Sequence, residues 1–548
     1  MSVRAREAKG FPEARNAASA AQGQLANGRP EPATCAAGDR SDMRDADVPE
    51  RGGFIAERGA GRGIGSMNLT ACLRRQSGER PDAPAIVCGA TAAGTPDGLV
   101  YSYARLDRVV DAIALRASGW DVGPDEFAIL DFKTHLPILL LRLGLARAGI
   151  PFANSSYPGD PSPSVHLGHD GGPPGRRRII ATPAWWTDAS GVPAPMHAGG
   201  DVLLKRQATS GTTGRPKRVP ITQAMYAARW HRPIGAPLPH NARLLCVSGP
   251  GGLGFGYALS VFEAGGTVVL LGPGDDPLGL VDRHRVNVLV ASPYAIDTTL
   301  RHRPPDAAPP ASLEQVVLSG GRLSVELLRL VSRRLCANII GMYGSTETGP
   351  LAAGPVSALP ETDGAAGFLL PGAEVQAIDD RGDVLPPGRI GQLRMRTPGL
   401  AREYLGDPEA TSRAFRDGWF HPNDIGTVTP DGVLVITGRG DDLINVGGSK
   451  FAPEVIERVL LRVAGLREAA AFGVPDALGK DTLHAAIVAD DDLDAGAILA
   501  AFRSTRGIPP PQVVLRVPHL PRGENGKVDR QALVRLAETA GRRPGRPA

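Results

Sequence analysis

The chain has 548 residues, more than one hydrophobic core usually serves, so at least two domains are expected. Hydrophobic residues make up 42% and charged residues 22% of the sequence, which is typical of a soluble globular protein and excludes a fibrous or fully disordered one. The net charge is only +4 and no dense basic run lies beside aromatic residues, so nucleic-acid binding is not expected. The five cysteines form no CxxC pair, which indicates neither a disulfide framework nor a zinc site and favours a cytoplasmic location. No apolar stretch is long enough to predict a membrane span.

Both ends of the chain differ in texture from the middle. Residues 1–66 are rich in Ala, Gly, Arg and Asp and lack sustained periodicity. They also lack the apolar stretch of a signal peptide and carry too many acids for a transit peptide. We expect a disordered N-terminal extension here, and the alternative that translation begins at Met67 stays open. The basic residues 541–548, with two prolines, are expected to be a disordered tail.

From Met67 onward, apolar periodicity alternates between strand and helix. We expect a strand end at Tyr101–Ser102 running into an amphipathic helix, a strand over 127–132, a helix over 136–148 and a strand over 150–154. Such alternation predicts parallel βαβ units. Residues 158–200, crowded with Pro, Gly and Asp, are expected to be rich in loops. Further strands are expected over 268–271, 286–291 and 316–319.

After Gly372 the pattern changes to short β-like runs separated by turns, over 375–379, 391–396 and 433–437. These runs predict a smaller β subdomain. A glycine- and charge-rich joint at 438–442 is the expected domain boundary, which places one domain at 67–438 and another at 439–540. The second is expected to be a small α+β unit with helices over 453–463, 495–503 and 530–538 and strands over 469–474 and 484–488. The expected fold class is therefore α/β, with a large N-terminal domain and a small, mobile C-terminal domain.

One segment combines glycines, hydroxyl side chains and a terminal lysine. Glycine lets the backbone approach a ligand closely, while hydroxyl groups and an ammonium group suit the oxygens of a polyphosphate. The Walker A pattern is absent, because neither Gly479-Lys480 nor Gly526-Lys527 is followed by Ser or Thr. An ordinary polar surface loop is the alternative. The segment reads Thr209, Ser210, Gly211, Thr212, Thr213, Gly214, Arg215, Pro216, Lys217.

A second polar segment, Gly341–Gly349, includes an apolar strand end, an aromatic residue and an acid. Glu347 could hold Mg²⁺ against phosphate oxygens, since Mg²⁺ prefers one or two carboxylates together with phosphates. Tyr343 offers a flat face for a nucleobase. Taken alone, this segment is more typical of a turn capped by Thr and Glu.

Together the motifs resemble those of the ANL superfamily of adenylate-forming enzymes, which includes acyl-CoA synthetases, nonribosomal-peptide adenylation domains and luciferases. The resemblance extends from about Met67 to Glu538. Its signatures stand here, in family order, as ATSGTTGRPKRV at 208–219, YGSTE at 343–347, GWFHPNDIG at 418–426, GRGDD at 438–442 and PRGENGKVDR at 521–530.

The resemblance implies ATP and Mg²⁺ as cofactors and assigns roles to particular residues. Lys527, Thr346 and Glu347 would be catalytic, and Glu347 would also be the metal ligand. Asp424 would bind the ribose hydroxyls, with Arg439 as a second ribose contact. The remaining nucleotide-binding positions would be Thr209, Ser210, Gly211, Thr212, Thr213, Gly214, Lys217, Gly320, Gly321 and Tyr343.

The family also rotates its small C-terminal domain between its two half-reactions. Asp441, between glycine-rich turns, would be the hinge. Gly447 and Gly448 would then lie on the face that meets the pantetheine thiol. Carboxylate attack on the α-phosphate gathers negative charge, which a lysine and a metal ion placed there stabilise.

The substrate is less constrained by the sequence. Gly252 stands where amino-acid-activating relatives carry an aspartate, so an aliphatic or aryl acid is expected rather than an α-amino acid. The five glycines between Gly249 and Gly256 are expected to leave space, with Phe255, Tyr257, Ser319 and Gly320 lining an acyl pocket. No cationic residue obviously awaits a second carboxylate.

Three functions stay open at this point. The first is an acyl-CoA ligase, and the second is a stand-alone adenylation enzyme that loads an acyl carrier protein. Both thiol acceptors present the same pantetheine arm. The third is a non-catalytic adenylate-binding protein, which the presence of Lys217, Glu347 and Lys527 disfavours.

Overall fold

The structure is a computed structural model that describes most of the chain from residue 68 to residue 541. The described ranges are 68–89, 98–123, 126–154, 165–168, 178–187, 192–197, 199–209, 217–231, 234–321, 323–360, 364–440, 444–446, 449–451, 453–475, 481–490, 493–505, 508–523 and 526–541.

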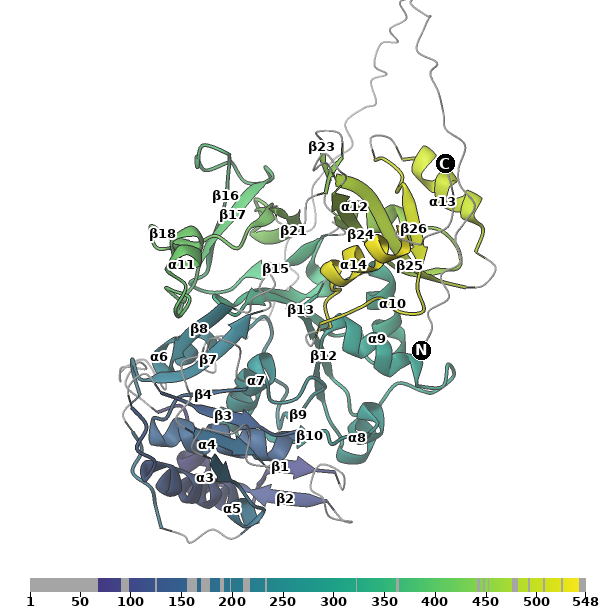
Figure 1. Cartoon of the computed structure of the whole chain (residues 1–548). Helices are drawn as coiled ribbons and strands as arrows, with labels where there is room; N and C mark the ends of the chain where they lie inside the picture. The colour runs from purple at the N-terminus through teal and green to yellow at the C-terminus, as the bar shows by residue number, and fades with distance from the viewer. Residues whose placement is uncertain are drawn as a thin grey trace, which may run out of the picture. The chain divides into compact units, whose positions relative to one another are not determined.

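A six-stranded sheet forms the first layer of the fold (Figure 1). Its spatial order is β6-β5-β3-β4-β7-β8, parallel except for the final β7–β8 hairpin. In that hairpin Thr209 lies opposite Lys217, so both ends of the expected phosphate segment are adjacent. The strands are β3 Ala128–Asp131, β4 Phe152–Ala153, β5 Val165–Gly168, β6 Arg178–Ile180, β7 Leu203–Thr209 and β8 Lys217–Thr222.

Helices α3 (Tyr103–Ser118) and α4 (His135–Ala148) pack closely against each other. A Cβ atom on Gly144 of α4 would lie 2.3 Å from Ile113 Cγ2 of α3, so this crossing requires glycine. The fully buried Arg147 pairs with Asp107 at 2.7 Å and Asp111 at 2.6 Å, which ties α4 to α3. The neighbouring helices are α1 Ala71–Glu79, α5 Ala184–Thr187 and α6 Gln223–Trp230.

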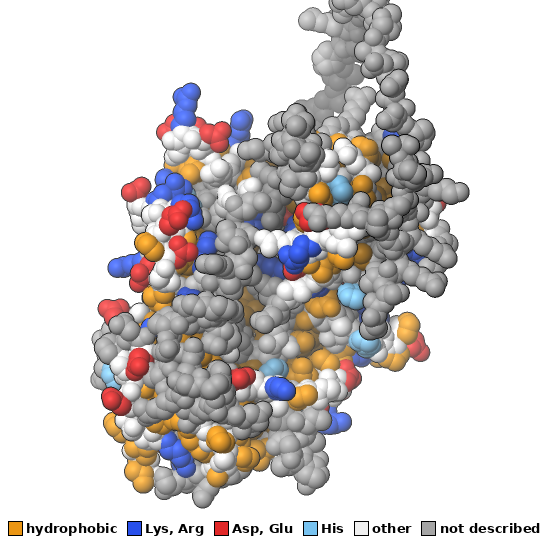
Figure 2. Space-filling view, in the orientation of Figure 1, with side chains coloured by type: hydrophobic (Ala, Val, Ile, Leu, Met, Phe, Trp, Pro, Cys, Tyr) orange, Lys and Arg blue, Asp and Glu red, His pale blue; other side chains and the backbone are white. Residues whose placement is uncertain are grey.

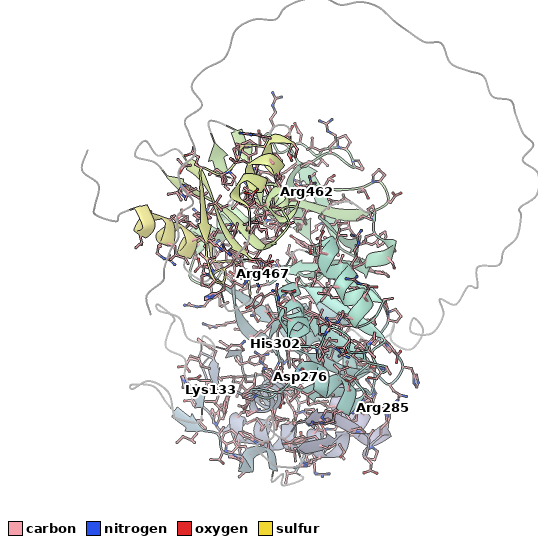
Figure 3. The ribbon with its side chains drawn as sticks, turned by 90° about the vertical axis from the view of Figure 1, so that its right-hand side faces the viewer. Lys133, Asp276, Arg285, His302, Arg462 and Arg467 are labelled. Carbon is pink, nitrogen blue, oxygen red and sulfur yellow. The ribbon has the colours of Figure 1, made fainter. Side chains whose placement is uncertain are left out.

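The second sheet has fifteen strands and begins with a parallel portion. The order there is β13-β12-β11-β9-β10-β1, with β2 antiparallel at the edge. Helix α8 is capped at both ends (Figure 3), by the Asp276 side chain and by Arg285 in the left-handed conformation. The elements are β1 Pro84–Cys88, β2 Leu99–Ser102, β9 Arg243–Cys246, α7 Gly252–Glu263, β10 Thr267–Leu270, α8 Pro277–His284, β11 Val288–Ala291, α9 Pro293–Arg301, β12 Gln315–Ser319, α10 Val325–Arg334 and β13 Ile339–Ser345.

The same sheet continues from β13 into an antiparallel portion with its own hydrophobic cluster around Leu351, Leu393 and Leu434. The β13–β14 hairpin joins the two portions. These elements are β14 Gly349–Pro355, the 3₁₀ turn η2 Val356–Ala358, β15 Ala365–Leu369, β16 Glu374–Ile378, β17 Gly391–Arg396, α11 Pro408–Ala414, β18 Phe415–Arg416, β19 Trp419–Phe420, β20 Asp424–Val428 and β21 Val433–Arg439.

Residues after 443 form two further hydrophobic clusters, both built only from this part of the chain. One is centred on Ile456 and Leu483, and the other on Phe472 and Leu533. The elements are the hairpin β22 Ile444–Val446 and β23 Ser449–Phe451, then α12 Pro453–Leu461, β24 Leu466–Pro475, β25 Asp481–Ala489, α13 Ala495–Arg503, β26 Val513–Arg516 and α14 Arg530–Gly541.

The α/β class and most of the expected elements are confirmed. The strand expected over 150–154 is shorter, reduced to β4. The expected β subdomain has its own core, but its strands extend the large sheet. Acidic and basic side chains are interspersed on the face shown in Figure 2. Among the described helices, none has the length and apolar character needed to cross a bilayer.

Candidate active site

The predicted site residues Gly320 and Gly321 follow β12, and the YGSTE segment begins within the neighbouring parallel strand β13. Gly320 has a φ of +89°, a left-handed conformation that favours glycine, and no atom lies within 4 Å of where its Cβ would be. Gly321 lies against Pro293. Ligands bind α/β sheets outside the carboxyl ends of parallel strands, so both glycines and the YGSTE segment lie at a favourable edge.

Glu347, in the turn between β13 and β14, is a buried acid with one firm partner. The Tyr404 hydroxyl donates to Glu347 Oε1 at 2.7 Å. Burial, and then Glu347, raises the pKa of Tyr404, so this hydroxyl keeps its proton and remains a donor. The interaction fixes one carboxylate oxygen and leaves the other to a ligand.

Lys217 approaches the same tyrosine from β8. Its ammonium nitrogen lies 5.0 Å from the centre of the Tyr404 ring, a cation–π contact. Leu405 N–H donates to the Arg218 carbonyl at 2.8 Å, which holds the Tyr404 segment beside the start of β8. Tyr404 therefore links the lysine of the phosphate segment to the predicted metal ligand.

Arg229 of α6 holds the turn that carries Thr346 and Glu347. Its guanidinium donates to the carbonyls of Thr346 at 3.0 Å, Glu347 at 2.7 Å and Gly399 at 2.8 Å. A Cβ on Gly349 would lie 2.6 Å from the Arg229 side chain, so glycine is needed where the arginine passes. One buried cation thus positions the acid without pairing with its carboxylate.

Tyr343, Asp424 and Arg439 form a second connected group. The Tyr343 hydroxyl donates to Asp424 Oδ2, and Arg439 Nε lies 3.1 Å from Asp424 Oδ1. The strands β20 and β21 place Asp424 directly opposite Arg439. Burial, and then Asp424, raises the pKa of Tyr343. An ionised carboxylate at this position can accept hydrogen bonds from a diol.

Asn423, the residue before Asp424, has a φ of +65°. Its carbonyl accepts a hydrogen bond from Gly440 N–H at 2.7 Å. Asparagine tolerates the left-handed conformation better than most residues, so Asn423 suits the bend that presents Asp424.

The loop that carries Lys527 is closed by backbone and side-chain hydrogen bonds. Its carbonyl accepts from Gly523 N–H at 2.9 Å, and Arg522 donates to the Gly526 carbonyl at 2.9 Å. The Arg522 guanidinium also lies 4.5 Å from the centre of the Tyr294 ring, at the start of α9. The Lys527 loop therefore contacts a residue that closely follows the carboxyl end of β11.

Several predicted site residues lie outside the described part of the chain. They are Ser210, Gly211, Thr212, Thr213, Gly214, the hinge residue Asp441 and the thiol-face residues Gly447 and Gly448. Among the described ones, the structure connects Lys217 with Glu347 through Tyr404, and Tyr343 with Asp424 and Arg439. It also puts Thr209 opposite Lys217.

Comparison with known proteins gives consistent matches. The AMP-binding enzyme family model matches residues 183–405. Enterobactin synthase component E of Escherichia coli is 30% identical over 394 residues, covering 67% of this chain and 70% of that protein. This chain belongs to the AMP-binding enzyme family. Feruloyl-CoA synthase of Amycolatopsis is 28% identical over 504 residues, covering 85% of this chain and 97% of that protein.

A solved structure matches most of this AMP-binding enzyme. ATP-bound MatB from Rhodopseudomonas palustris matches with a TM-score of 0.73 and 25% identity, covering 86% of this chain and 100% of that one. The expected ANL resemblance is confirmed, and the chain is an adenylate-forming ligase of the acid–thiol type.

The glycine-rich segment of this AMP-binding enzyme corrects one expectation. Gly251 does face open space, and a Cβ on Gly252 would meet only the Gln207 side chain, at 3.9 Å, but three other glycines are needed for packing. A Cβ on Gly249 would meet His135, one on Gly254 would meet the Gly249 carbonyl, and one on Gly256 would lie 2.0 Å from Trp230. The expectation that the whole cluster leaves space is therefore wrong for those three positions, because backbone and side chains already fill it.

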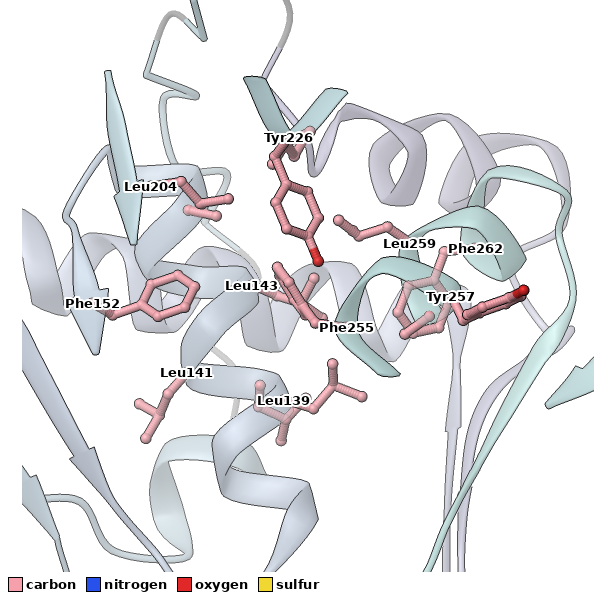
Figure 4. Close-up of a cluster of buried hydrophobic side chains, with 14 of the residues drawn as sticks. Leu139, Leu141, Leu143, Phe152, Leu204, Tyr226, Phe255, Tyr257, Leu259 and Phe262 are labelled. Carbon is pink, nitrogen blue, oxygen red and sulfur yellow. The ribbon is translucent and has the colours of Figure 1, made fainter. Parts of the chain in front are cut away.

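The expected pocket residues Phe255 and Tyr257 are both buried on α7. Phe255 packs against Phe152 and Tyr226 (Figure 4), with ring centres 6.2 and 5.6 Å away. Tyr257 makes an edge contact with Trp230 at 5.5 Å. Both side chains belong to the core, so any acyl group would be bounded by this cluster.

Sequence reasoning missed Tyr404 and Arg229. Tyr404 follows the glycine-containing loop 399–403 and precedes a helix N-cap at Asp407, so an aromatic residue in a loop was its only signal. Arg229 is indistinguishable in sequence from an exposed helical arginine.

Glu347 suits Mg²⁺, because a single carboxylate with one oxygen already oriented matches an ion that takes most ligands from phosphate and water.

Proposed function

We propose that this enzyme activates a carboxylic acid with ATP to an acyl-AMP and then transfers the acyl group to the pantetheine thiol of CoA. The proposal rests on two groups of connected side chains that lie near the β13–β14 hairpin. One is Lys217, Tyr404 and Glu347. The other is Tyr343, Asp424 and Arg439. The first suits a metal-bound polyphosphate, and the second suits a nucleoside.

In the first half-reaction, a carboxylate oxygen of the acid attacks the α-phosphorus of ATP. The bond from that phosphorus to the β-phosphate oxygen breaks, and pyrophosphate leaves. Lys217 would face the phosphates, Glu347 would hold Mg²⁺, and Lys527 would stabilise the charge that develops at the α-phosphate. When bound, Mg²⁺ would neutralise phosphate charge.

The nucleoside would be held by the second group. The Tyr343 ring would support the adenine, with Gly320 and Gly321 allowing close backbone approach. Asp424 would accept hydrogen bonds from the ribose hydroxyls, and Arg439 orients its carboxylate. The serine, threonines and glycines at 209–214 would surround the phosphates.

In the second half-reaction, the thiol sulfur attacks the acyl carbonyl carbon. The bond to the phosphate oxygen breaks, AMP leaves, and the thiol proton passes to solvent. We propose that residues 439–540 rotate about Asp441 for this step and bring Gly447 and Gly448 to the pantetheine arm. The name of feruloyl-CoA synthase supports CoA as the acceptor. An acyl carrier protein remains the second candidate, since it presents the same thiol.

The test is acid-dependent ATP–pyrophosphate exchange across aliphatic, aryl and α-amino acids. We expect exchange with an aliphatic or aryl acid, and Lys527→Ala should reduce it about 100- to 1,000-fold. Lys133→Ala, which removes an exposed lysine (Figure 3), is the control and should keep full exchange.

Two results would count against the proposal. Exchange that survives in Lys527→Ala would remove the assigned role of this lysine. Nucleotide binding without exchange for any acid would support a non-catalytic adenylate-binding protein. Adding CoA or a carrier protein to the active enzyme then identifies the acceptor.

A further inference from the structure

Three buried cations surround one aromatic side chain beside the expected acyl region. Lys205 of β7, Arg142 of α4 and Arg229 of α6 are 6%, 3% and 2% exposed. The Lys205 ammonium lies 4.7 Å from the centre of the Tyr226 ring. Figure 4 shows Tyr226 between Leu204 and Leu259, with Phe255 beneath it.

The three cations differ in how far they are satisfied. Arg229 donates to three carbonyls. Arg142 donates to the Pro250 carbonyl and to Asn154 Oδ1, but its Nε has no partner among the described residues. Lys205 has only the Tyr226 ring, with no hydrogen bond or ion pair to any described residue.

No carboxylate offsets this charge within the described part of the chain. Asp107 and Asp111 pair with Arg147, Glu347 accepts from Tyr404, and Asp424 pairs with Arg439. Burial, reinforced by Arg142 and Arg229, lowers the pKa of Lys205 well below its ordinary value. An unpaired buried cation is costly, so Lys205 favours its protonated form only beside an anion, and an ordinary strand would carry an apolar residue here.

The cations are also connected to the open part of the glycine-rich segment. Arg142 holds the Pro250 carbonyl, and the Tyr226 hydroxyl donates to the Gly252 carbonyl at 3.2 Å. Gly251 has open space beside it, and a Cβ on Gly252 would meet only the Gln207 side chain, at 3.9 Å. Phe152 and Phe255, both buried in the core, have their ring centres within 6 Å of the Arg142 guanidinium carbon.

We propose that Lys205 and Arg142 bind a second carboxylate on the acid substrate, so that the enzyme activates a dicarboxylic acid with an aliphatic or aryl skeleton. This inference rests on the proposed adenylation function and narrows its substrate class. The reacting carboxylate would meet ATP, while the distal carboxylate would pair with the two cations. Such a pairing supplies the anion that the buried ammonium lacks.

The test compares each dicarboxylic acid with its methyl half-ester over a series of aliphatic lengths and with aryl diacids, using ATP–pyrophosphate exchange. The wild-type enzyme should favour a diacid over its half-ester at least tenfold in kcat/KM. Lys205→Met, which keeps an unbranched side chain of nearly the same length without its charge, should lower that ratio at least tenfold. Lys133→Met, on the surface, should leave the ratio unchanged.

A binding measurement without turnover provides a second readout. Saturating diacid should raise the Tm of the wild-type enzyme and not that of Lys205→Met, which should itself be at least as stable. A wild-type preference for half-esters, or equal loss of exchange with both acids in Lys205→Met, would overturn the inference while leaving adenylation intact. Absence of exchange with every acid, together with no diacid-induced shift in Tm, would instead remove both.

Discussion

At the scale of single residues, the central feature is a tyrosine hydroxyl that orients a buried acid. Tyr404 donates to Glu347 while its ring faces the Lys217 ammonium. A carboxylate inside a protein is stable only when its oxygens are hydrogen bonded. The tyrosine therefore fixes the predicted metal ligand before any nucleotide binds.

Removal of the Tyr404 hydroxyl should lower both the stability of the protein and the rate of pyrophosphate exchange. Tyr404→Phe keeps the ring over Lys217 but leaves a buried oxygen of Glu347 without its donor, which should lower the free energy of unfolding by about 1–3 kcal/mol. Pyrophosphate exchange should fall about tenfold, which corresponds to about 1.4 kcal/mol of activation free energy, and should require more Mg²⁺, because Glu347 is then held less firmly. Urea denaturation and Mg²⁺ titration of exchange measure the two effects.

Tyr294→Phe is the matched control, because Tyr294 is 44% exposed and keeps its ring contact with Arg522 in the variant. Equal behaviour of the two variants would show that the hydroxyl of Tyr404 has no special role.

The sequence predicted those site residues whose roles are carried by local motifs. Lys217, Tyr343, Glu347, Asp424 and Arg439 each stand in a recognisable segment, and the structure connects them in two groups. Their supporting residues could not be predicted in this way. The partners of Glu347 are 57 residues away for Tyr404 and 118 for Arg229, and only folding brings them together.

At the scale of elements, the packing of α3 on α4 depends on one small residue. Gly144 allows the two helices to approach until Ile113 occupies the position of the missing side chain. Glycine in a helix ordinarily lowers stability by about 0.5–1 kcal/mol relative to alanine, so here the close contact must offset that cost.

Two glycine-to-alanine changes separate these effects. Gly144→Ala should lower the free energy of unfolding by about 1–3 kcal/mol, because the new methyl group overlaps Ile113. Gly78→Ala in α1, where no atom lies within 4 Å of the new Cβ, should instead raise it by about 0.5–1 kcal/mol. Chemical denaturation measures both, and a stabilised Gly144→Ala would refute the packing argument.

Elements with strong periodicity were predicted well from the sequence. The helix expected over 136–148 is α4, and the strand over 127–132 contains β3. The glycine-rich segment was harder, because composition cannot distinguish a glycine that leaves space from one whose space is filled. Gly251 belongs to the first kind and Gly256 to the second.

At the scale of the whole molecule, one hairpin connects the two halves of the large sheet. The strands β13 and β14 join a parallel portion to an antiparallel one. The change of sequence texture after Gly372 predicted later strands of the antiparallel portion, but it missed β14 and β15, which precede Gly372. It also did not predict the continuity with the parallel portion, because sequence patterns do not specify which strands pair. The boundary at 438–439 and the hinge at Asp441 stay predictions.

The β13–β14 hairpin also brings Tyr343 and Glu347 to one region of this sheet, and we propose that the nucleoside and the metal-bound phosphates bind there. The claim requires that the acid itself attacks the α-phosphorus. Any other route, such as attack on the terminal phosphate, would break a different bond in ATP.

Oxygen transfer from labelled acid tests this claim most directly. The enzyme is incubated with ATP, CoA and an accepted acid carrying ¹⁸O in its reacting carboxylate, and the products are measured by mass spectrometry. If the carboxylate attacks the α-phosphorus, we expect one ¹⁸O atom in each AMP and none in pyrophosphate. Label in orthophosphate with release of ADP, or unlabelled AMP formed alongside the thioester, would contradict it.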